Sequence, residues 1–356
     1  DAMTAQPAAA IAAFRELAAM GEPARPVLAY YLVERLTADR HAVRAAIEFL
    51  GRVGEDEKRL DELRAQAIDN LRGLDEGTKK ARDAYDRGIP LLRRRIEADR
   101  LRLQTAATLL HRGEMVRLLR QASAKDAGAF SAAEESSLTD EAERAMGVTV
   151  RKALGVAPFG PTGRPAGGLL LDLWLHNAHE SVKLYNHGLD VLGDDERQLV
   201  EMVNEYRHFL RLLPLEVDPR FVQSARRHSR EMVEKGYFSH TSPTPGLEQP
   251  ANRIMAAGFV ARGRWAVSEN IVMRARSARH AFDLWFDSPA HHRGMVDAEM
   301  SVTGVGRWDT HWTQHFGSAP RLMWLDERTR QAAIIKGEIL PPQSAAATRP
   351  ITRSGR

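Results

Sequence analysis

The sequence predicts an α+β protein in which an all-helical region precedes a region of mixed helices and short strands. Apolar residues recur every three or four positions through most of the first 125 residues, which is typical of amphipathic helices. After residue 190, helical stretches alternate with short β-type segments bounded by Gly, Pro and Ser. With 356 residues, the chain exceeds the usual size of a single core, so we expect more than one domain.

The N-terminal region, residues 1–125, is predicted to be a helical bundle or hairpin. Residues 4–51 indicate three helices, the first of which ends at Gly21. Residues 56–125 continue as charged helices. Pro90 is expected near the start of the last one, because a proline inside a helix costs about 3 kcal/mol. The apolar stripe of these helices fits an intramolecular bundle better than a partner-binding coiled coil, although both use the same spacing.

Residues 126–190 are expected to form a linker with one helix. The stretch 126–168 is rich in Ser, Gly and Pro and is predicted to be mostly irregular, whereas residues 169–184 have helical periodicity. A mixed α/β domain is expected at residues 191–335. The tail at residues 336–356 is rich in Pro, Ser, Thr, Ala and Arg, and is predicted to be disordered.

Local signals mark the elements of the mixed domain. Helix starts are expected at three capping positions: Asp194 with Asp195, Asp218 with Pro219, and Ser277. Two extended segments, residues 304–308 and 312–317, flank a polar turn and predict a β-hairpin. His228 shares a helical face with apolar residues, so we favour a hydrogen-bonded core histidine over an additional ligand. Four aromatic residues are expected in the core: Trp285, Trp308, Trp312 and Phe316.

Composition excludes several classes of function. The formal net charge is +4 and the pI about 9.4, but the basic residues are scattered among nearly as many acidic ones, so nucleic acid is not an expected partner. The absence of cysteine excludes disulfides, thiolate nucleophiles and cysteine-based metal sites. No stretch approaches the roughly 18 apolar residues of a membrane span, so no transmembrane segment is expected. The chain starts at Asp1 without an initiator Met or signal peptide and is interpreted as a mature or trimmed form.

Three residues stand out as candidates for chemistry: His240, Glu269 and His291. Each lies beside a Ser/Pro turn signal or a strand-like segment. Two imidazoles and one carboxylate can form a metal site or an acid/base site if the fold brings them together. The chain lacks both the His-Glu-x-x-His helix of zinc proteases and the Gly-x-Ser-x-Gly turn of esterases. No motif therefore gives independent support for an enzyme.

The order of motifs between residues 194 and 317 resembles the CAP superfamily of cysteine-rich secretory, antigen 5 and pathogenesis-related-1 proteins (SCP-like), and in particular its disulfide-free bacterial branch. The motifs that keep the family order are Asn204-x-Tyr206-Arg207, Ala225-x-x-His228, Gly236-Tyr237-Phe238-Ser239-His240, Arg253 with Ala257-Gly258-Phe259, Ser268-Glu269-Asn270-Ile271, Trp285-x-x-Ser288-Pro289-x-His291, Gly304-Val305-Gly306 and Trp312-Thr313-Gln314-x-Phe316-Gly317. They cover about a third of the chain.

The resemblance implies an α-β-α sandwich with an open cleft lined by two histidines and acidic residues. His240 matches the first cleft histidine, Glu269 the glutamate, and His291 the second histidine. We prefer His291 to His292 because it keeps the family distance to the following Gly-Val-Gly motif. Ser288 stands where animal and plant members carry a second glutamate. In this respect the sequence departs from a four-ligand site.

The expected function is that of an exported bacterial CAP-domain protein, secreted or periplasmic, whose cleft binds a divalent metal or a small ligand. His240, His291 and Glu269 are the predicted metal ligands, with Glu269 alternatively an acceptor that orients a histidine, and weakly bound Zn²⁺ is the expected cofactor. A first alternative is a metal-dependent hydrolase of the cell envelope, in which these three residues are catalytic and Ser239 or Ser242 is a candidate nucleophile. A second is a structural or interaction protein with an inert CAP domain. The expected partners are a small ligand or cell-envelope component, and a protein bound through the N-terminal helices.

Overall fold

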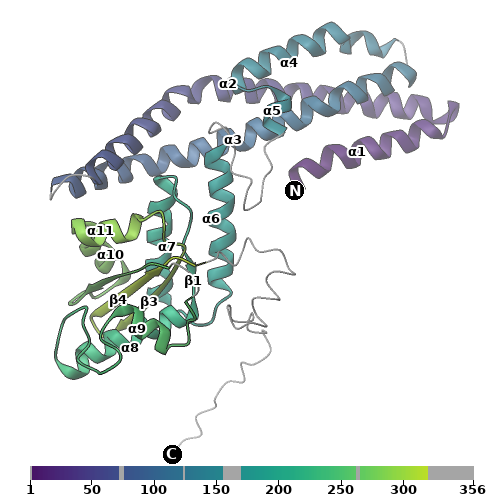
Figure 1. Cartoon of the computed structure of the whole chain (residues 1–356). Coiled ribbons are helices and arrows are strands. Elements are labelled where there is room, and N and C mark those ends of the chain that lie inside the picture. The colour runs from purple at the N-terminus through teal and green to yellow at the C-terminus, as the bar shows by residue number, and fades with distance from the viewer. Residues whose placement is uncertain (1, 72–75, 123–124, 155–169, 262–264, 320–356) are drawn as a thin grey trace, which may run out of the picture. The chain divides into compact units, whose positions relative to one another are not determined.

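The computed structural model describes residues 2–71, 76–122, 125–154, 170–261 and 265–319 (Figure 1). The chain divides into two compact units. The first, called here the helical unit, consists of Asp1–Ala65 and Asp86–His176. The second, called the sandwich unit, consists of Gln66–Tyr85 and Asn177–Arg356. A short segment from early in the sequence is therefore part of the C-terminal unit.

The N-terminal half of the chain is built almost entirely of helices. In order they are α1 (Ala2–Ala19), the 3-10 turn η1 (Glu22–Ala24), α2 (Arg25–Leu71), α3 (Glu76–Ala122), η2 (Asp126–Phe130), α4 (Ala132–Met146), α5 (Val150–Leu154) and α6 (Leu171–His187). The predicted break at Gly21 is confirmed, since this glycine has a φ of 81° that ends α1. α2 and α3 each extend into residues 66–85.

Two expectations for the long helices are wrong. The second and third helices predicted within residues 4–51 are parts of the single helix α2, because buried apolar residues continue along it from Leu28 to Val53 without interruption. Pro90 lies inside α3 rather than near its start. The proline removes one backbone donor, but α3 buries apolar side chains on both sides of it in sequence, such as Ala84 and Leu92. That packing outweighs the lost hydrogen bond.

Helices α4 and α5 take up most of the described residues, 126–154, of the connection predicted to be irregular over residues 126–168. The hydroxyl of Ser131 accepts a hydrogen bond from the Glu134 N–H at 3.2 Å and caps α4, so a serine that suggested a loop instead starts a helix. The described part of residues 126–190 contains three α-helices rather than the single one predicted. The Pro/Gly-rich run at residues 155–169 and the tail at 336–356 lie outside the described residues.

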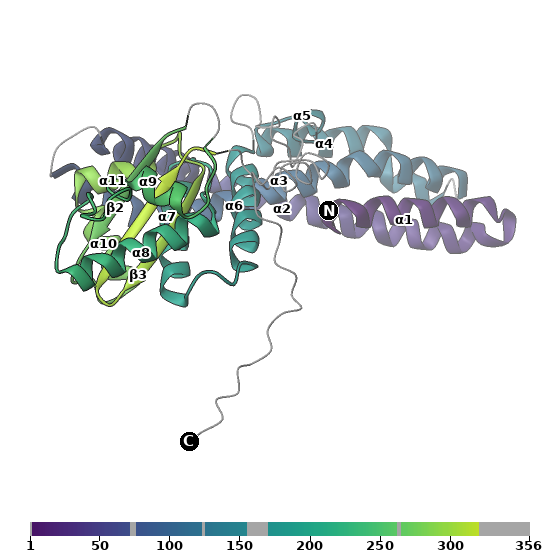
Figure 2. The ribbon, with the colours of Figure 1, turned by 60° about the horizontal axis from the view of Figure 1, so that its bottom comes forward.

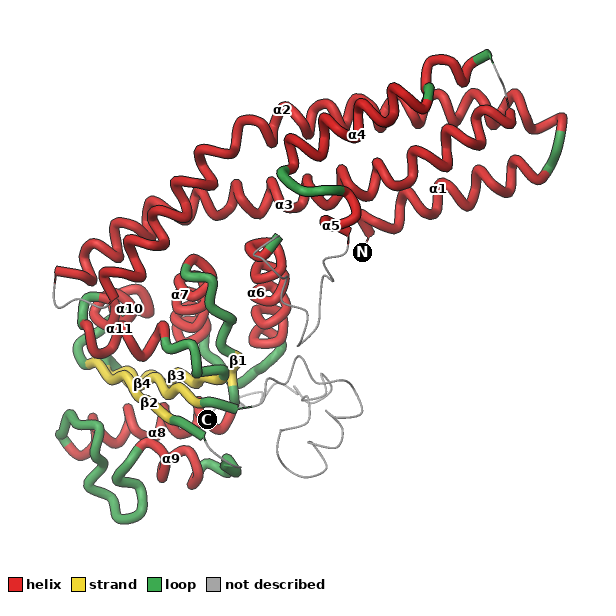
Figure 3. Tube along the Cα trace, turned by 45° about the horizontal axis from the view of Figure 1, so that its top comes forward, coloured by secondary structure: helices red, strands yellow, loops and turns green. Residues whose placement is uncertain are grey.

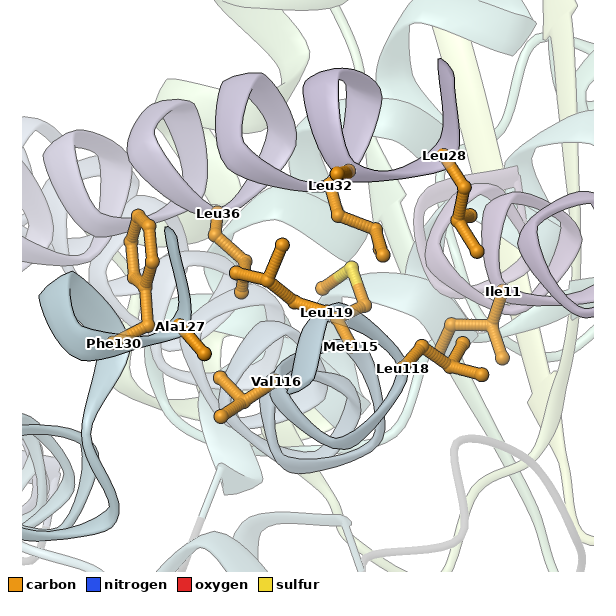
Figure 4. Close-up of a cluster of buried hydrophobic side chains, with 11 residues drawn as sticks. Ile11, Leu28, Leu32, Leu36, Met115, Val116, Leu118, Leu119, Ala127 and Phe130 are labelled. Carbon is orange, nitrogen blue, oxygen red and sulfur yellow. The ribbon is translucent and has the colours of Figure 1, made fainter. Parts of the chain in front are cut away.

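The helical unit is held together by apolar side chains from several helices. Figure 4 shows the cluster where α1, α2, α3 and η2 meet. Its labelled members are Ile11, Leu28, Leu32, Leu36, Met115, Val116, Leu118, Leu119, Ala127 and Phe130. A second cluster packs Leu138 and Ala142 of α4 against Val43 of α2 and Ala106 of α3. The apolar stripes therefore face one another within the unit, as an intramolecular bundle requires.

The C-terminal part is an α-β-α sandwich, which confirms the predicted α+β fold class. Its elements are α7 (Asp194–Phe209), β1 (Glu216–Val217), α8 (Pro219–Lys235), α9 (Pro250–Ala256), β2 (Val267–Val272), α10 (Ala278–Phe286), α11 (Pro289–Val296), β3 (Val302–Trp308) and β4 (His311–Gly317). The sheet has the order β1-β3-β4-β2, in which only the β1–β3 pair is parallel. Helices α8 and α9 cover one face, and α7, α10 and α11 cover the other (Figures 2 and 3).

Local capping signals explain most of these helix starts. Asp218 accepts a hydrogen bond from the Arg220 N–H and begins α8, and Ser277 begins α10 in the same way, so both predictions are confirmed. The predicted cap of α7 is wrong, because its first turn follows Gly193, whose N–H donates to the Glu196 carboxylate at 2.9 Å. The Ser-Pro pair that ends α10 also starts the unpredicted helix α11.

Two glycines let α8 lie directly on the sheet. A Cβ atom at Gly304 or Gly306 of β3 would overlap backbone atoms of α8 between residues 221 and 226. The Gly-Val-Gly motif therefore sets how closely this helix approaches the central strands. Trp308, at the end of the same strand, is 43% exposed beside the hairpin turn. It is not the core residue that was expected.

Candidate functional site

Two paired strands place a buried carboxylate beside a buried imidazole. Glu269 of the edge strand β2 lies directly opposite His315 of β4. Side chains opposite one another in an antiparallel ladder share a face of the sheet, and His315 Nε2 lies 2.7 Å from Glu269 Oε2. An ionised carboxylate only accepts hydrogen bonds, so the Nε2–H of His315 is the donor. The strand register therefore fixes this contact.

The loop after α8 brings a second imidazole to the same carboxylate. Gly236 ends α8 in a left-handed conformation, with a φ of 68°, and the chain turns away from the helix axis. His240 Nδ1 then lies 2.7 Å from Glu269 Oε1, while its side chain stays 52% exposed. Because the Nδ1–H donates to the carboxylate, Nε2 is the ring nitrogen left for a ligand.

Arg253 of α9 ties this loop to the carboxylate. Its Nη2 donates to Glu269 Oε2 at 2.5 Å. Its Nη1 donates to three backbone carbonyls, those of His240, Leu247 and Glu248, at 3.1, 3.1 and 2.9 Å. The guanidinium is buried, and its several donors in one plane suit it to holding a carboxylate and a loop together.

Glu269 is ionised at neutral pH. Burial alone would raise its pKa, but hydrogen bonds from His240 and His315 and the charge of Arg253 more than offset burial, so the pKa is lowered overall. Each carboxylate oxygen already accepts at least one hydrogen bond. Glu269 is therefore arranged as an acceptor that orients the two rings, and it is a poor general base near pH 7.

His228 of α8 lies near the same carboxylate without a hydrogen bond to it. Its Nε2 is 3.0 Å from Ser239 O and 3.9 Å from Glu269 Oε1. Burial lowers the pKa of His228 to about 4, although the charge of Glu269 acts in the opposite direction. The ring is therefore neutral at pH 7, and its Nε2–H donates to the carbonyl. The prediction of a hydrogen-bonded core histidine is confirmed.

Asn270, the residue after Glu269, binds the backbone of His291, the second candidate histidine. His291 belongs to α11, in the other layer of the sandwich. Asn270 Nδ2 donates to the backbone oxygen of His291 at 2.9 Å, and a Cβ at Gly294 would lie 2.9 Å from the Asn270 amide oxygen. Consecutive side chains of a strand point to opposite faces. Glu269 thus holds the His240 loop on the α8–α9 face, and Asn270 holds α11 on the other face. One edge strand positions both segments.

His291 offers a buried ring nitrogen. Its Nδ1 has no hydrogen-bond partner among the residues that the structure describes. Burial lowers the pKa of His291, and the charge of His240 lowers it further, so the two imidazoles interact electrostatically and the His291 ring is neutral at pH 7. A neutral imidazole with an unpartnered nitrogen is the form that binds metal ions.

The donor set for a metal is smaller than the three predicted ligands. Over the described ranges, no group of three or more His, Cys, Asp and Glu side chains is arranged to hold a metal ion. The oxygens of Glu269 are already bonded, and Ser288 at the start of α11 has no carboxylate. What remains is a pair of imidazoles, those of His240 and His291. Two imidazole ligands with open positions are typical of labile metal sites, whereas structural zinc sites have four protein ligands.

The two candidate nucleophiles are engaged in the loop that carries His240. Ser242 is buried and donates to Glu231 Oε2 at 2.7 Å. The hydroxyl of Ser239 accepts a hydrogen bond from the Thr241 N–H at 3.0 Å. Short side-chain-to-backbone bonds of this kind stabilise turns. Both serines therefore have a structural explanation.

The motifs do not single out His315, nor do they indicate that Arg253 binds the carboxylate. The contact of His315 with Glu269 depends on β2 and β4 being neighbours, which sequence spacing does not show. One usable signal is strand alternation, which puts His315 on the same face as Thr313. Thr313 accepts a hydrogen bond from Ser229 of α8 at 2.9 Å, so that face points into the sandwich.

Comparison with known proteins assigns part of the sandwich unit, residues 200–316, to a family. Residues 200–316 match the family CAP, described as the cysteine-rich secretory protein family. The uncharacterized protein YkwD of Bacillus subtilis is 30% identical over 123 residues, which are 34% of this chain and 46% of that protein. The uncharacterized membrane protein YlbC of Bacillus subtilis is 28% identical over 121 residues, 34% of each chain. The match therefore spans less than half the length of either relative.

Solved structures resemble the same part of the chain. An extracellular protein containing a SCP domain from Bacillus anthracis has 27% identity and a TM-score of 0.32, covering 34% of this chain and 39% of that one. An outer surface protein from Borrelia burgdorferi has 20% identity and a TM-score of 0.31, covering 36% of this chain and 96% of that one. Among the described helices, none is long and apolar enough to cross a membrane. Residues 200–316 are a CAP domain of the disulfide-free bacterial type, and they make up about a third of the chain.

Proposed function

We propose that the CAP domain of this protein binds a divalent metal ion weakly, with Zn²⁺ the best candidate, through the imidazoles of His240 and His291. The observation that carries the proposal is the hydrogen bond from His240 Nδ1 to Glu269 Oε1 at 2.7 Å. It commits one ring nitrogen to a buried carboxylate and leaves Nε2 of a half-exposed side chain for a ligand. A carboxylate that accepts from the far nitrogen of a histidine is a common feature of metal sites, because it fixes the tautomer and strengthens the ligand.

His291 supports the proposal from the other layer of the sandwich. Its ring is neutral at pH 7, since burial and His240 lower its pKa, and its Nδ1 is unpartnered among the described residues. A divalent cation would accept the lone pair of a neutral imidazole nitrogen from each ring. Bound zinc would supply Lewis acidity and open coordination positions for a ligand oxygen.

Ligand binding is better supported than hydrolysis. A hydrolase would need a general base with a free lone pair and a pKa near the working pH. Glu269 has a lowered pKa and uses both oxygens as acceptors for His240, His315 and Arg253. Glu269 therefore holds the rings in place and does not itself serve as the base. We therefore assign the cleft a binding role.

Isothermal titration with ZnCl₂ tests the proposal in the full chain. The parent should give a saturable one-site heat, and the double variant His240→Ala/His291→Ala should lose it. Glu269→Gln keeps the shape but weakens the acceptor, so the affinity for zinc should fall about 10- to 100-fold. The control is His280→Ala, which removes an exposed histidine of α10 elsewhere on the same unit and should titrate like the parent.

The outcome that contradicts the proposal is equally clear. If the double variant and His280→Ala bind zinc as the parent does, the metal is not held by these two rings. If Glu269→Gln alone is without effect while the double variant loses binding, the rings bind metal but the carboxylate does not orient them. The titration should run near pH 7.5, because protonated imidazoles do not bind metal.

We also propose that the protein acts outside the cytoplasm. The matched family is described as secretory. The test is fractionation of the cells that make the protein, with detection by antibody in medium, envelope and cytoplasm. Recovery in the cytoplasm alone would contradict export. Binding of a further partner through the helical unit stays a prediction.

A further inference from the structure

The start of α3 packs against the CAP domain although it lies more than a hundred residues earlier in the sequence and outside the family match. Tyr85 is buried, and its ring meets the edges of Tyr206 and Phe209 of α7 at centroid distances of 5.0 and 5.7 Å. It also stacks on Phe286 of α10 at 6.2 Å. The Tyr85 hydroxyl donates to Glu205 Oε2 at 2.9 Å. One side chain thus joins two helices of the sandwich.

Arg82, one turn earlier on α3, strengthens the same contact. Its guanidinium lies 3.8 Å from the centroid of the Phe286 ring and forms an ion pair with Asp283 at 3.0 Å. The hydroxyl of Thr78 donates to the Asp287 backbone oxygen at 3.4 Å. Aromatic, cation–π and ionic contacts all converge on the end of α10. Without residues 78–85, this aromatic face of the domain would lose its cover.

Two buried hydrogen bonds connect the aromatic face that residues 78–85 cover to the start of α11. His292 is 1% exposed, and its Nδ1 lies 2.8 Å from Phe286 O. A carbonyl can only accept, so the Nδ1–H donates, and His292 Nε2 accepts from the Tyr206 hydroxyl at 2.9 Å. Burial lowers the pKa of His292 to about 4, and the charge of Arg82 acts in the same direction. The neutral ring is the form that both bonds require.

His292 is adjacent to the candidate ligand His291. The two hydrogen bonds of His292 anchor the first turn of α11 from inside the sandwich, and the bond from Asn270 to the His291 backbone oxygen anchors it from the edge strand. Tyr85 touches the ring of Tyr206, and Tyr206 bonds to His292. A continuous chain of contacts therefore runs from α3 to the backbone that carries His291.

We propose that residues 78–85 of α3 are an intramolecular clamp on the CAP domain, and that Tyr85 and Arg82 position α11, and with it His291, through Tyr206 and His292. Tyr85, Arg82, Tyr206 and His292 are positioning residues, because none of them is a proposed metal ligand. The inference concerns the placement of α11 and does not rest on zinc binding. It gives residues 78–85 a role in the placement of His291.

Hydrogen–deuterium exchange on the full chain tests the clamp. Amides of α11, residues 289–296, are compared with those of β3 as an internal reference. Tyr85→Ala should speed exchange in α11 about tenfold, since aromatic contacts of this size are worth about one decade in an equilibrium constant. Tyr85→Phe keeps the ring and should stay within about threefold of the parent. The matched control is Lys80→Ala, an exposed residue of the same helix, which should exchange like the parent.

A spectroscopic readout separates positioning from general loss of stability. In protein with ¹³C-labelled histidine, the ring chemical shifts of His292 at pH 7.5 should change in Arg82→Met, because Arg82 packs on the Phe286 ring that contacts His292, whereas those of His280 should stay unchanged. Arg82→Met should also exchange faster in α11 than Lys80→Ala does, and this variant decides the question if Tyr85→Ala does not fold.

Two results would overturn the clamp. The first is equal α11 exchange in Tyr85→Ala, Arg82→Met and Lys80→Ala. The second is a rise in exchange that is the same in α11 and β3, since that would mean that α3 stabilises the whole unit without setting the position of α11.

Discussion

Two deeply buried arginine–carboxylate pairs, one taken from each unit of the molecule, differ in what else the carboxylate holds. In the helical unit, Arg64 meets Asp172 through two bonds of 2.6 and 3.2 Å, with side-chain exposures of 4% and 0%. In the sandwich unit, Arg253 meets Glu269 through one bond of 2.5 Å, with exposures of 4% and 2%. By burial and charge alone the pairs look alike.

The acceptor positions distinguish them. Asp172 faces guanidinium groups, since Arg95 also approaches it at 3.8 Å. Glu269 shares its oxygens between Arg253 and the rings of His240 and His315. A carboxylate bound to arginines holds helices together, whereas a carboxylate that also accepts from a half-exposed histidine presents the other ring nitrogen to a ligand. The histidine, rather than the buried ion pair, therefore indicates the site.

The largest expected effect comes from removing either arginine. Arg253→Met and Arg64→Met each leave a buried carboxylate without its nearest cation, and each should lower the free energy of unfolding of its unit by about 3–5 kcal/mol. If His240 binds zinc as proposed, Arg253→Met should weaken that binding and Arg64→Met should not, because Arg253 holds the carboxylate that accepts from His240. Urea unfolding followed by hydrogen exchange resolves the two units. A loss below about 1 kcal/mol for Arg253→Met would mean that Glu269 is not held as a buried ion.

A fall in pH should change the stability of the two units differently, and this is the next largest expected effect. His228 and His292 of the sandwich unit have pKa values lowered to about 4 by burial, from an ordinary 6.5. Between these pH values the unfolded chain binds more protons than the folded one. The stability present above pH 6.5 is therefore lost as pH falls toward 4, by about 2 kcal/mol per histidine at pH 5. In the helical unit, burial raises the pKa of Asp39 and Asp99 instead. As the pH falls, these carboxylates therefore become protonated in the folded state before they do so in the unfolded chain.

The sandwich unit should thus weaken between pH 7 and pH 5. Protonation of these aspartates acts in the opposite direction on the helical unit. The buried tryptophans Trp285 and Trp312 report unfolding of the sandwich by fluorescence. Their urea midpoint should fall over this pH range, and His280→Ala should fall by the same amount, because its ring is exposed. A midpoint that does not change from pH 7 to pH 5 would contradict the burial of neutral histidines.

The fold was predictable where short-range chemistry decides it. Asp218 and Ser277 start helices because each offers a side-chain acceptor beside a helical pattern. The continuation of α2 and the proline inside α3 were not predictable in this way. Long-range burial along the bundle overrides a weak local break, and no local signal gives the strength of that burial.

The candidate site was predictable as a set of residues but not as an arrangement. The motifs and the family resemblance single out His240, Glu269 and His291, whereas the part played by His315 depends on which strands pair. The position of Tyr85 against α7 is even harder to predict from the sequence, because it joins segments separated by more than a hundred residues. Contacts set by topology carry no signature in a single sequence.

Glycine-to-alanine substitutions should give the smallest change in stability, and its sign should be opposite in the two units. Gly306 of β3 has no room for a methyl group against α8, so Gly306→Ala should destabilise the sandwich unit by about 1–3 kcal/mol or more. Gly51 lies on an exposed face inside α2 with no atom within 4 Å of an added Cβ, so Gly51→Ala should stabilise the helical unit by about 0.5–1 kcal/mol. Thermal unfolding of both variants measures the contrast. Equal shifts of one sign would show that helix packing on β3 does not need the glycine, and that the Gly-Val-Gly motif has another cause.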